Sequence, residues 1–598
     1  MLDSIPVLIQ AVLWPLLGAA IVLGLRRWLP NWLRSLIAAA AAAASLAILW
    51  PHGGDAHPQA VDLAWGSHDF FRMGVAFYPH TLSILAGIVL TGVTAAAALG
   101  AGSNGVNGQR THWHGLILVA LAGSLTAILA ANLLTLALGS GLLTLAVTAL
   151  AAAGAPVAGE RSERSERSRS PLAAAVPGTV ATLLIYLSAL QMDAQIGHAS
   201  LQGRIWTASA QALLAAGGAL WLFSFPVGAA SRSQSIVSYL LPCGAGLYLL
   251  ARVLSIAPAL SGQPALLIVG GAMLLVGGAL AWLNGAWPGI AIHQAGYGLV
   301  FIVLWGGQAG TTQPPVPWPL VSLTLALGTL AISASAGRSA NGPSRQSPAS
   351  RWAGLSWLAQ WTGLAWLARQ IEPWRVKVRS YAASHLRFKR PWLTWLGRLL
   401  AVLLPAIALA SLAGFPLTVG AVGRWHFYGG ILGQGQAALL LIILLSDSLL
   451  IAGLWAALRV LLEHKDGRVS VARAVAMIAL FSAVVVWGVA PGNLSRAVGL
   501  SPVRSPGVSV WGIGLLYILP WLVGTWLAYA GARRPAYIDR LRLLGRRYHL
   551  DRSYQAAAWI GARLLSVVYW LGVVGEGAGW WGWAIIVLAV GVILSIAR

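Results

Sequence analysis

The most conspicuous shortage in this sequence is charge, and acidic charge above all. Only 9% of the 598 residues are charged, and 15 acidic residues stand against 39 basic ones. Soluble domains carry about 25% charged residues, whereas 58% of this chain is hydrophobic. The shortage excludes a soluble enzyme and a soluble nucleic-acid-binding protein, and it predicts a protein of the membrane.

Cysteine is almost absent as well. The one cysteine, Cys243, excludes an intramolecular disulfide and any metal or iron–sulfur site built from cysteines. The chain also lacks a nucleotide-binding fingerprint at a strand–helix turn, and no His, Asp or Glu cluster has metal-ligand spacing. No nucleophile can be paired with a base. We therefore expect this chain to carry no catalytic residue, no metal and no cofactor of its own.

Long apolar runs fill the chain instead, and many reach the ~20 residues that a helix needs to cross a bilayer. The first run follows an acidic start, so we interpret it as a helix and not as a signal peptide. The stretch 554–574 carries Arg563 and either spans the membrane or lies along its surface. The other expected spans are 7–25, 33–50, 80–100, 114–131, 133–154, 172–191, 207–229, 236–257, 263–283, 286–306, 318–337, 395–431 (broken), 436–461, 469–490, 508–531 and 579–597. The fold class is thus an all-α polytopic membrane protein of about 16 transmembrane helices.

Basic residues gather between the spans. When the spans are counted, five basic stretches fall on the same side of the membrane: 26–34, 160–170, 338–394, 463–468 and 533–552. The positive-inside rule places these loops in the cytoplasm and the N-terminus outside, in a multi-pass protein of the inner (plasma) membrane. The same rule accounts for the net charge of +24 without nucleic acid.

Two of the basic stretches have a character of their own. The tandem run ERSERSERSRS, 160–170, is typical of a solvated loop, with a docking site as the alternative. The segment 338–394 opens like a disordered linker and continues with Trp mixed with Arg. That mixture predicts a helix lying at the membrane interface, with Trp among the lipid headgroups.

Two spans contain helix-breaking clusters. FSFPVG carries Pro226, and AGFPLTVG carries Gly414, Pro416 and Gly420. The clusters lie in the seventh and twelfth expected spans, and such paired interruptions point to an inverted-repeat transport fold. Broken helices free backbone groups, which in a membrane must face protein or water. The alternative is that Pro and Gly are simply common in membrane helices.

Four stretches in the right order resemble the motifs of a known family. SLAGFPLTVGAVGRWHFYGGIL resembles a twelfth-helix motif of the form SLAGxPPxxGFxGKF, and LAANLLTLALGSGLLTL resembles the fifth-helix motif LADNLLLLFLGWELLTL. GGALWLFSFPVG is similar to GALAKSAQFPFH of the seventh helix, and IHQAGYGLVFIV to a stretch ending AQLGYxLL. The family is the antiporter-like membrane subunits of respiratory complex I (NADH-quinone oxidoreductase), shared with Mrp antiporters and membrane-bound hydrogenases. The resemblance runs from about residue 80 to 490 and marks a divergent member.

The resemblance implies two inverted five-helix repeats, with helices 7 and 12 broken. It divides the chain into N-terminal helices at 1–110, a first repeat at 111–260, a second repeat at 261–465 with the basic linker 338–394, and C-terminal helices at 466–598 with a basic amphipathic segment at 533–575. It also implies proton translocation driven by redox chemistry in partner subunits. Other membrane subunits would be the partners, with NADH and quinone reached only through them.

This sequence replaces most of the family's titratable residues. Where the family has a glutamate in helix 5 and a lysine in helix 7, this chain has Ser140 and Gly141, and Trp221. The family's helix-8 lysine falls near Gly244, and its Lys-Arg pair in the linking region falls near Asn284 and Gly285. Only the helix-12 position keeps a charge, as Arg424. Arginine stays protonated in proteins, so we expect Arg424 to act as a fixed charge and not as a proton carrier.

Few titratable groups remain inside the spans. Asp447 lies in the middle of LLIILLSDSLLIAGLW, and an isolated carboxylate there costs about 2.5–3.5 kcal/mol on insertion scales. We interpret it as a pathway or ion-pair residue, with a protonated acid bonded to a neighbouring serine as the alternative. His293 is a candidate relay or a hydrogen-bonded structural histidine. Arg252 is expected to snorkel from the outer end of its span. The proton-pathway candidates are therefore Arg424, Asp447 and His293.

Three functions remain open from the sequence. The chain is a complex I-type subunit with a rewired proton path, or it holds the same place as a structural or coupling element without a path. The third is an Mrp-like cation/proton antiporter, which the replaced residues disfavour most, because an exchanger must carry its own coupling groups.

Overall fold

The protein is described by a computed structural model, which gives residues 6–26, 28–53, 61–65, 73–101, 112–153, 171–191, 208–230, 237–256, 263–284, 287–306, 391–463, 471–491 and 510–533. These residues form a polytopic bundle of 15 α-helices. The helices are α1 (Val7–Gly24), α2 (Asn31–Leu49), α3 (Thr81–Ala101), α4 (Trp113–Leu129), α5 (Leu133–Ala153), α6 (Pro171–Gln191), α7 (Ala208–Ala230), α8 (Val237–Ile256), α9 (Gln263–Asn284), α10 (Trp287–Gly306), α14 (Pro391–Leu412), α15 (Val419–Gly433), α16 (Ala437–Glu463), α17 (Val471–Val489) and α19 (Val510–Arg533).

The helices agree with the apolar runs of the sequence, with bounds that differ by a few residues. Within the described ranges, eight helices are long and apolar enough to cross a membrane, and six more are apolar but shorter. The expected spans 318–337, 554–574 and 579–597 lie outside the described residues, as do the basic stretches 160–170, 338–390 and 534–552. The number of 16 spans therefore stays a prediction.

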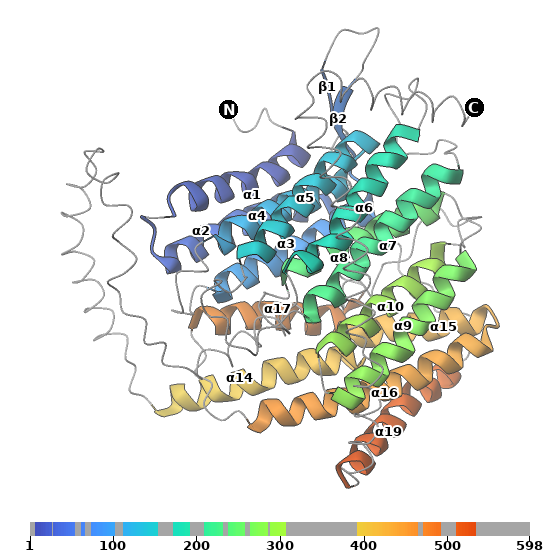
Figure 1. The fold of residues 1–598 in the computed structure, drawn as a ribbon. Helices are drawn as coiled ribbons and strands as arrows, with labels where there is room; N and C mark the ends of the chain where they lie inside the picture. Colours follow the sequence, from blue (N-terminus) through green and yellow to red (C-terminus); the bar gives the residue numbers. More distant parts are fainter. Residues whose placement is uncertain are drawn as a thin grey trace, which may run out of the picture.

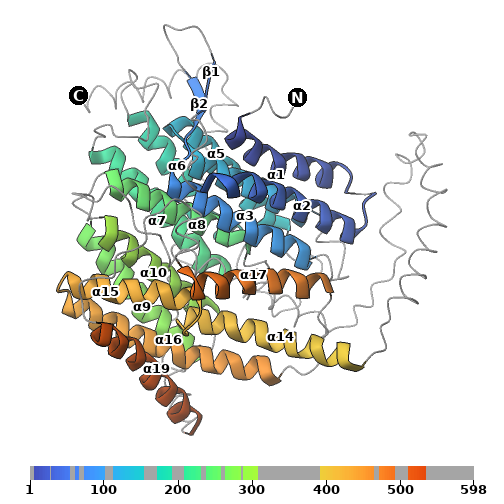
Figure 2. The same cartoon turned by 180° about the vertical axis from the view of Figure 1, so that it is seen from behind.

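The helices form two groups with α17 between them (Figures 1 and 2). Consecutive helices from α4 to α8 pack side by side. Helix α2 packs on both α1 and α3, and all three helices contact α4. In the second group, α9 packs on both α10 and α16, and α16 packs on α19. Helix α17 contacts α3 on one side and α14 and α15 on the other, while α10 contacts α7 and α8. Elements far apart in the sequence thus surround α10, which contacts α7, α8, α9, α15 and α16.

Paired glycines at the centre of α9 allow its two neighbours to approach closely. A Cβ added to Gly277 would lie 2.3 Å from the backbone nitrogen of His293 on α10. A Cβ added to Gly278 would lie 2.6 Å from the backbone oxygen of Ser446 on α16. Small residues at helix crossings serve this purpose in membrane bundles. Adjacent glycines therefore set the separation of α10 and α16 at the level of His293 and Asp447.

Gly278→Ala is expected to lower the thermal stability of the protein in detergent, because the new methyl group must displace the α16 backbone. Gly271→Ala, on the same helix, is the control, since its Cβ would meet only Ile442 Cγ2 at 3.9 Å. Without a clash, Gly→Ala in a helix is neutral or stabilises by up to about 1 kcal/mol. Equal midpoints for the two variants would show that the close approach of α9 and α16 is absent in solution.

A small hairpin, which the sequence analysis did not anticipate, joins the first helices. Strand β1 (Val61–Trp65) pairs antiparallel with β2 (Met73–Phe77). The hairpin is fixed to the α4–α5 turn, because the Ala131 amide donates to the Ala76 carbonyl at 2.7 Å and the Tyr78 amide to the Leu129 carbonyl at 2.9 Å. Each strand has only five residues, and the periodicity of so short an apolar run does not distinguish a strand from part of a helix.

Arg252 corrects a second expectation. It does not snorkel to the surface: the side chain is buried and donates from Nη1 to the Ala130 carbonyl at 2.6 Å. Ala130 follows the last residue of α4, where backbone carbonyls lack partners within the helix. The guanidinium therefore caps α4, and this tertiary contact replaces the water that snorkelling would reach.

A basic cluster lies where α1 and α2 meet the start of α4. Arg26 Nη1 lies 2.9 Å from His112 Nδ1, and Arg34 bonds the Arg26 carbonyl and Asn31. Burial and the charges of Arg26 and Arg34 lower the pKa of His112 below its ordinary value. The folded state therefore favours the neutral imidazole, whose Nδ1 accepts a hydrogen bond from Arg26 Nη1.

We expect the protein to lose stability as the pH falls below about 6.5, the ordinary pKa of histidine. A histidine whose pKa is lowered by folding binds its proton more readily in the unfolded state, so acid favours unfolding. The measurement is the thermal midpoint in detergent from pH 7.5 to 5.5, with His112→Gln beside the wild type. The variant should show the weaker pH dependence, and two parallel curves would contradict the assignment.

Candidate functional site

The predicted break in the twelfth span is present between α14 and α15. Gly414 adopts φ = +74°, its amide donates to the Ser411 carbonyl at 2.9 Å, and the Phe415 amide donates to the Ala410 carbonyl at 2.7 Å. This is the Schellman arrangement, in which a left-handed residue just beyond the helix satisfies two of its last carbonyls. Leu417 is also left-handed, at φ = +69°. The chain then resumes as α15, with Gly420 buried in its first turn and Pro416 exposed in the break.

The break expected at Pro226 is not found. Helix α7 continues from Ala208 to Ala230 without interruption. Pro226 lies close to the C-terminal end of α7. Proline has no N–H to donate to the preceding turn, and only about one turn of helix follows it here. Prolines are also accommodated inside four other helices of the described part, at Pro15, Pro242, Pro405 and Pro520. In the helices that the structure describes, proline alone does not break a helix, whereas the break between α14 and α15 contains the left-handed residues Gly414 and Leu417.

Arg424 and Asp447, both predicted as pathway candidates, form a buried ion pair. Arg424 donates from Nε to Asp447 Oδ2 at 3.1 Å and from Nη2 to Asp447 Oδ1 at 3.0 Å. The two parallel bonds match the planar guanidinium to the carboxylate. The Arg424 side chain is 6% exposed and that of Asp447 is 0% exposed. Helix α15 supplies the arginine and α16 the aspartate, so the pair joins the helix after the break to its neighbour.

The third Arg424 nitrogen binds the end of the broken helix. Nη1 donates to the Leu412 carbonyl at 2.5 Å, and the Gln294 side-chain amide of α10 approaches the same oxygen at 3.5 Å. Leu412 is the last residue of α14, and the Schellman bonds leave its carbonyl without a backbone donor. The guanidinium also lies 5.6 Å from the ring centroid of Tyr297, a distance at which cation and ring attract.

Two further side chains complete the coordination of Asp447. The Tyr428 hydroxyl, one turn after Arg424 on α15, donates to Oδ2 at 2.5 Å. His293 Nε2 on α10 lies 3.4 Å from Oδ1 and 3.2 Å from Ser446 Oγ. Because the Ser446 hydroxyl donates to the Ile443 carbonyl at 3.1 Å, its oxygen can accept from His293. This network assigns the imidazole proton to Nε2.

The site gathers all three predicted pathway residues within one hydrogen-bonded cluster. His293, Arg424 and Asp447 come from α10, α15 and α16, so only the tertiary fold brings them together. Three residues of the cluster were not predicted from the sequence: Tyr428, Gln294 and Tyr297. Tyr428 had a signal, because it stands at the i+4 position from Arg424 on one helix face. His426 is half-buried and is in none of the contacts of the cluster.

The arrangement is electrostatically demanding. Each buried charge loses its hydration. The free energy of this desolvation is offset only when the two charges are well aligned and their remaining hydrogen bonds are satisfied. Here the carboxylate accepts from Arg424 and Tyr428 and lies near His293, and the guanidinium is bound on all three nitrogens. Chemically, the cluster holds one fixed positive charge beside three groups that exchange protons: a carboxylic acid, an imidazole and a phenol.

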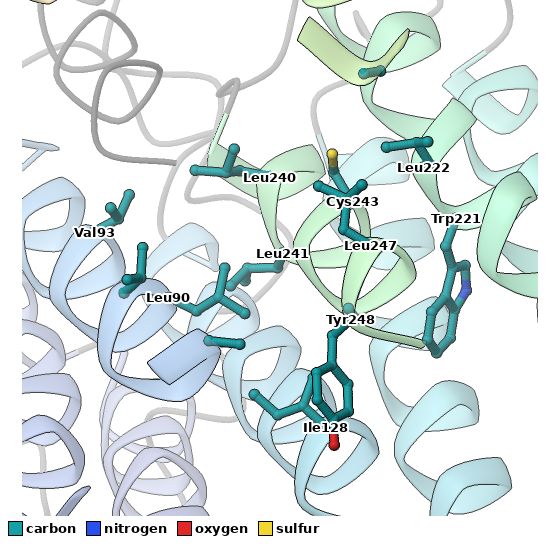
Figure 3. Packing of buried hydrophobic residues seen from close by; sticks show 14 of the residues in the cluster. Leu90, Val93, Ile128, Trp221, Leu222, Leu240, Leu241, Cys243, Leu247 and Tyr248 are labelled. Atoms are coloured by element: carbon teal, nitrogen blue, oxygen red, sulfur yellow. The ribbon is translucent and has the colours of Figure 1, made fainter. Parts of the chain in front are cut away.

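The helices α4–α8 contain almost no charged residues. Within α4–α8 as the structure bounds them, Arg252 is the only Asp, Glu, Lys or Arg, and it caps α4. Trp221, at the position where the family motif has lysine, is fully buried. Figure 3 shows Trp221 on one side of α8, near Tyr248, and Leu90 of α3 on the opposite side of that helix. The Arg424–Asp447 pair therefore has no counterpart within α4–α8, where the buried titratable side chains include His114 and Tyr248. Among the described residues, no group of three His, Cys, Asp or Glu side chains is placed to hold a metal.

Comparisons with known proteins give a fold and no sequence match. No protein-family model matches the chain, and neither does any curated protein. The chain is similar to a chain in the structure of the membrane-bound sulfane sulfur reductase, an archaeal respiratory membrane complex, with a TM-score of 0.63, 16% identity, and 98% of this chain and 99% of that chain covered. It is also similar to a chain of the Mrp complex from Dietzia sp. DQ12-45-1b, with a TM-score of 0.62 and 16% identity, where 96% of this chain matches 63% of that chain.

Proposed function

We propose that this chain is an antiporter-like membrane subunit of a complex I-type respiratory assembly and takes part in redox-driven proton translocation. The observation that carries the proposal is the buried cluster of Arg424, Asp447, His293 and Tyr428 beside the broken helix. Ionisable residues inside a membrane bundle are costly and mark ion or proton pathways by default. The fold that the chain shares with a respiratory complex and an Mrp complex supports the same class.

Protons would pass through the cluster along groups that already touch. His293 Nε2, Asp447 and the Tyr428 hydroxyl form a line across α10, α16 and α15. Asp447 is the central group, because it is the only one in contact with both others. It can accept a proton when its bonds to Arg424 open, and it can return the proton when they close.

Arg424 would not carry protons itself, but would couple the movement of the broken helix to the protonation of Asp447. It keeps its charge, and its three nitrogens bind both Asp447 and the Leu412 carbonyl at the end of α14. Movement of the α14–α15 break would therefore change how strongly the guanidinium stabilises the carboxylate. A redox-driven change in a partner subunit that reaches this break would switch Asp447 between ionised and protonated forms. NADH and quinone would be bound by such partners and not by this chain.

The second candidate function is a structural or coupling subunit without a proton path. Its supporting observation is that the Asp447 carboxylate is fully engaged by Arg424 and Tyr428, which suits a permanent ion pair. An Mrp-like antiporter is the third candidate, and the scarcity of charged residues in α4–α8 disfavours it because few groups remain there to couple a cation to protons.

Proton uptake by the assembled complex in proteoliposomes tests the proposal. Asp447→Asn and Arg424→Ala are compared with the wild type, and Glu463→Gln at the C-terminal end of α16 is the matched control. We expect Asp447→Asn to abolish the share of uptake that depends on this chain, and Glu463→Gln to leave it intact. Uptake that is unchanged in both Asp447→Asn and Arg424→Ala would exclude a path through the cluster and favour the structural role.

A further inference from the structure

Buried polar atoms beside the ion pair lack hydrogen-bond partners. In the part of the chain that the structure describes, they include His293 Nδ1 and the hydroxyls of Tyr297, Ser411 and Tyr517. His293 and Ser411 are fully buried, and Tyr297 is 5% exposed. Native proteins bond nearly all such groups to protein or to ordered water. The protein around these atoms therefore leaves hydrogen-bonding capacity for a ligand.

These atoms border the same cluster. Tyr297 lies one turn after His293 on α10 and under the Arg424 guanidinium. Ser411 precedes Leu412, whose carbonyl binds Arg424 and Gln294. Tyr517 comes from α19, which packs on α15 and α16. Trp521, one turn further along α19, packs on Phe415 of the break with ring centroids 5.6 Å apart.

The chemistry of these groups selects the ligand. His293 Nδ1 is an acceptor, because its proton is on Nε2, and the three hydroxyls both donate and accept. The groups are neutral, and none of them is a carboxylate that would hold a metal cation. Water satisfies this mixture of donors and acceptors, and buried waters make about 3 such hydrogen bonds each.

We propose that His293 Nδ1, Tyr297, Ser411 and Tyr517 form a water-binding site beside the ion pair, which connects the relay to α19. The inference rests on the proposed function for its role, although the site itself does not. A proton crossing it enters one water or hydroxyl as another leaves, so each group returns to its starting state. The relay would thus lead from His293, past Tyr297 beside Arg424, to Tyr517 on α19.

Thiol labelling tests the water site without any transport measurement. Because Cys243 is the chain's one cysteine, Cys243→Ala gives a background in which Ser411→Cys is the only thiol of this chain. Labelling is done on the assembled complex and is measured on this chain after the subunits are separated. The probe is 2-aminoethyl methanethiosulfonate, a small hydrophilic thiol reagent. Ala408→Cys is the matched control, because Ala408 lies on the same helix and is 2% exposed among apolar side chains. We expect modification of Ser411→Cys and not of Ala408→Cys. Equal lack of reaction in both would overturn the water site.

Proton uptake tests the connection to α19. Tyr297→Phe and Tyr517→Phe keep the ring and remove the hydroxyl, and each should reduce uptake while Ser411→Cys stays reactive. Unchanged uptake in both variants would overturn the connection. A wild-type complex that moves no protons would instead overturn the proposed function and the connection together, and labelling would still decide the water site.

Discussion

Asp447→Leu is expected to destabilise the folded protein by about 3–5 kcal/mol, the usual cost of removing one partner from a buried ion pair. The loss leaves the Arg424 guanidinium buried with only the Leu412 carbonyl as a hydrogen-bond acceptor. The double variant Arg424→Leu/Asp447→Leu should recover much of the loss, because two apolar side chains need no pairing. Denaturant unfolding of the four proteins in mixed micelles gives the coupling energy through a double-mutant cycle.

Ser448→Ala is the control for this cycle. Ser448 lies next to Asp447 and is buried, but its hydroxyl bonds only to the Leu444 carbonyl of its own helix, at 2.7 Å. Its removal should cost far less than the loss of Asp447. Additive effects of the two leucine substitutions would mean that Arg424 and Asp447 are not paired in the folded protein.

Gly414→Ala is expected to combine two costs at the break. A non-glycine residue in the left-handed region costs about 1–2 kcal/mol, and Gly414 adopts φ = +74°. In addition, its Cβ would lie 2.6 Å from Arg424 Cδ and 2.8 Å from Arg424 Nη1. The added atom must displace the guanidinium that binds Asp447, and overpacking of this kind costs about 1–3 kcal/mol more.

Gly435→Ala separates the two costs. Gly435 has nearly the same backbone conformation, φ = +69°, and a Cβ there would meet nothing within 4 Å. This control should show the backbone cost alone, in the same unfolding assay. A loss of stability in Gly414→Ala no larger than in Gly435→Ala would contradict the contact between the break and Arg424.

The sequence predicts the helices well because membrane spans depend on one strong signal. An apolar run of about 20 residues has few alternatives to a helix in lipid. The site residues are also recognisable in the sequence. Arg424, Asp447 and His293 stand out because charged and titratable groups are rare within the spans. Their mutual contact is a different matter, since it depends on how α10, α15 and α16 pack.

The missed features share a tertiary cause. Arg252 finds a free carbonyl at the end of α4, and no local pattern reveals which helix end lies beside it. Tyr428 is one aromatic residue among many, and its role depends on the position of Asp447 on another helix. At Pro226 the sequence predicts a break, but α7 continues through this residue to Ala230. A single proline is thus accommodated when the residues around it stay helical.

The most direct test of the central claim is the protonation of Asp447 itself. Infrared difference spectra of the assembled complex, recorded between its resting and reduced states, report the carbonyl band of any carboxylic acid that gains a proton. If the Arg424–Asp447 pair opens to carry protons, the wild type should show such a band, and Asp447→Asn should lack it while Glu463→Gln retains it. Identical spectra for the wild type and Asp447→Asn would mean that Asp447 stays ionised in a permanent ion pair, and the proposed path would be wrong.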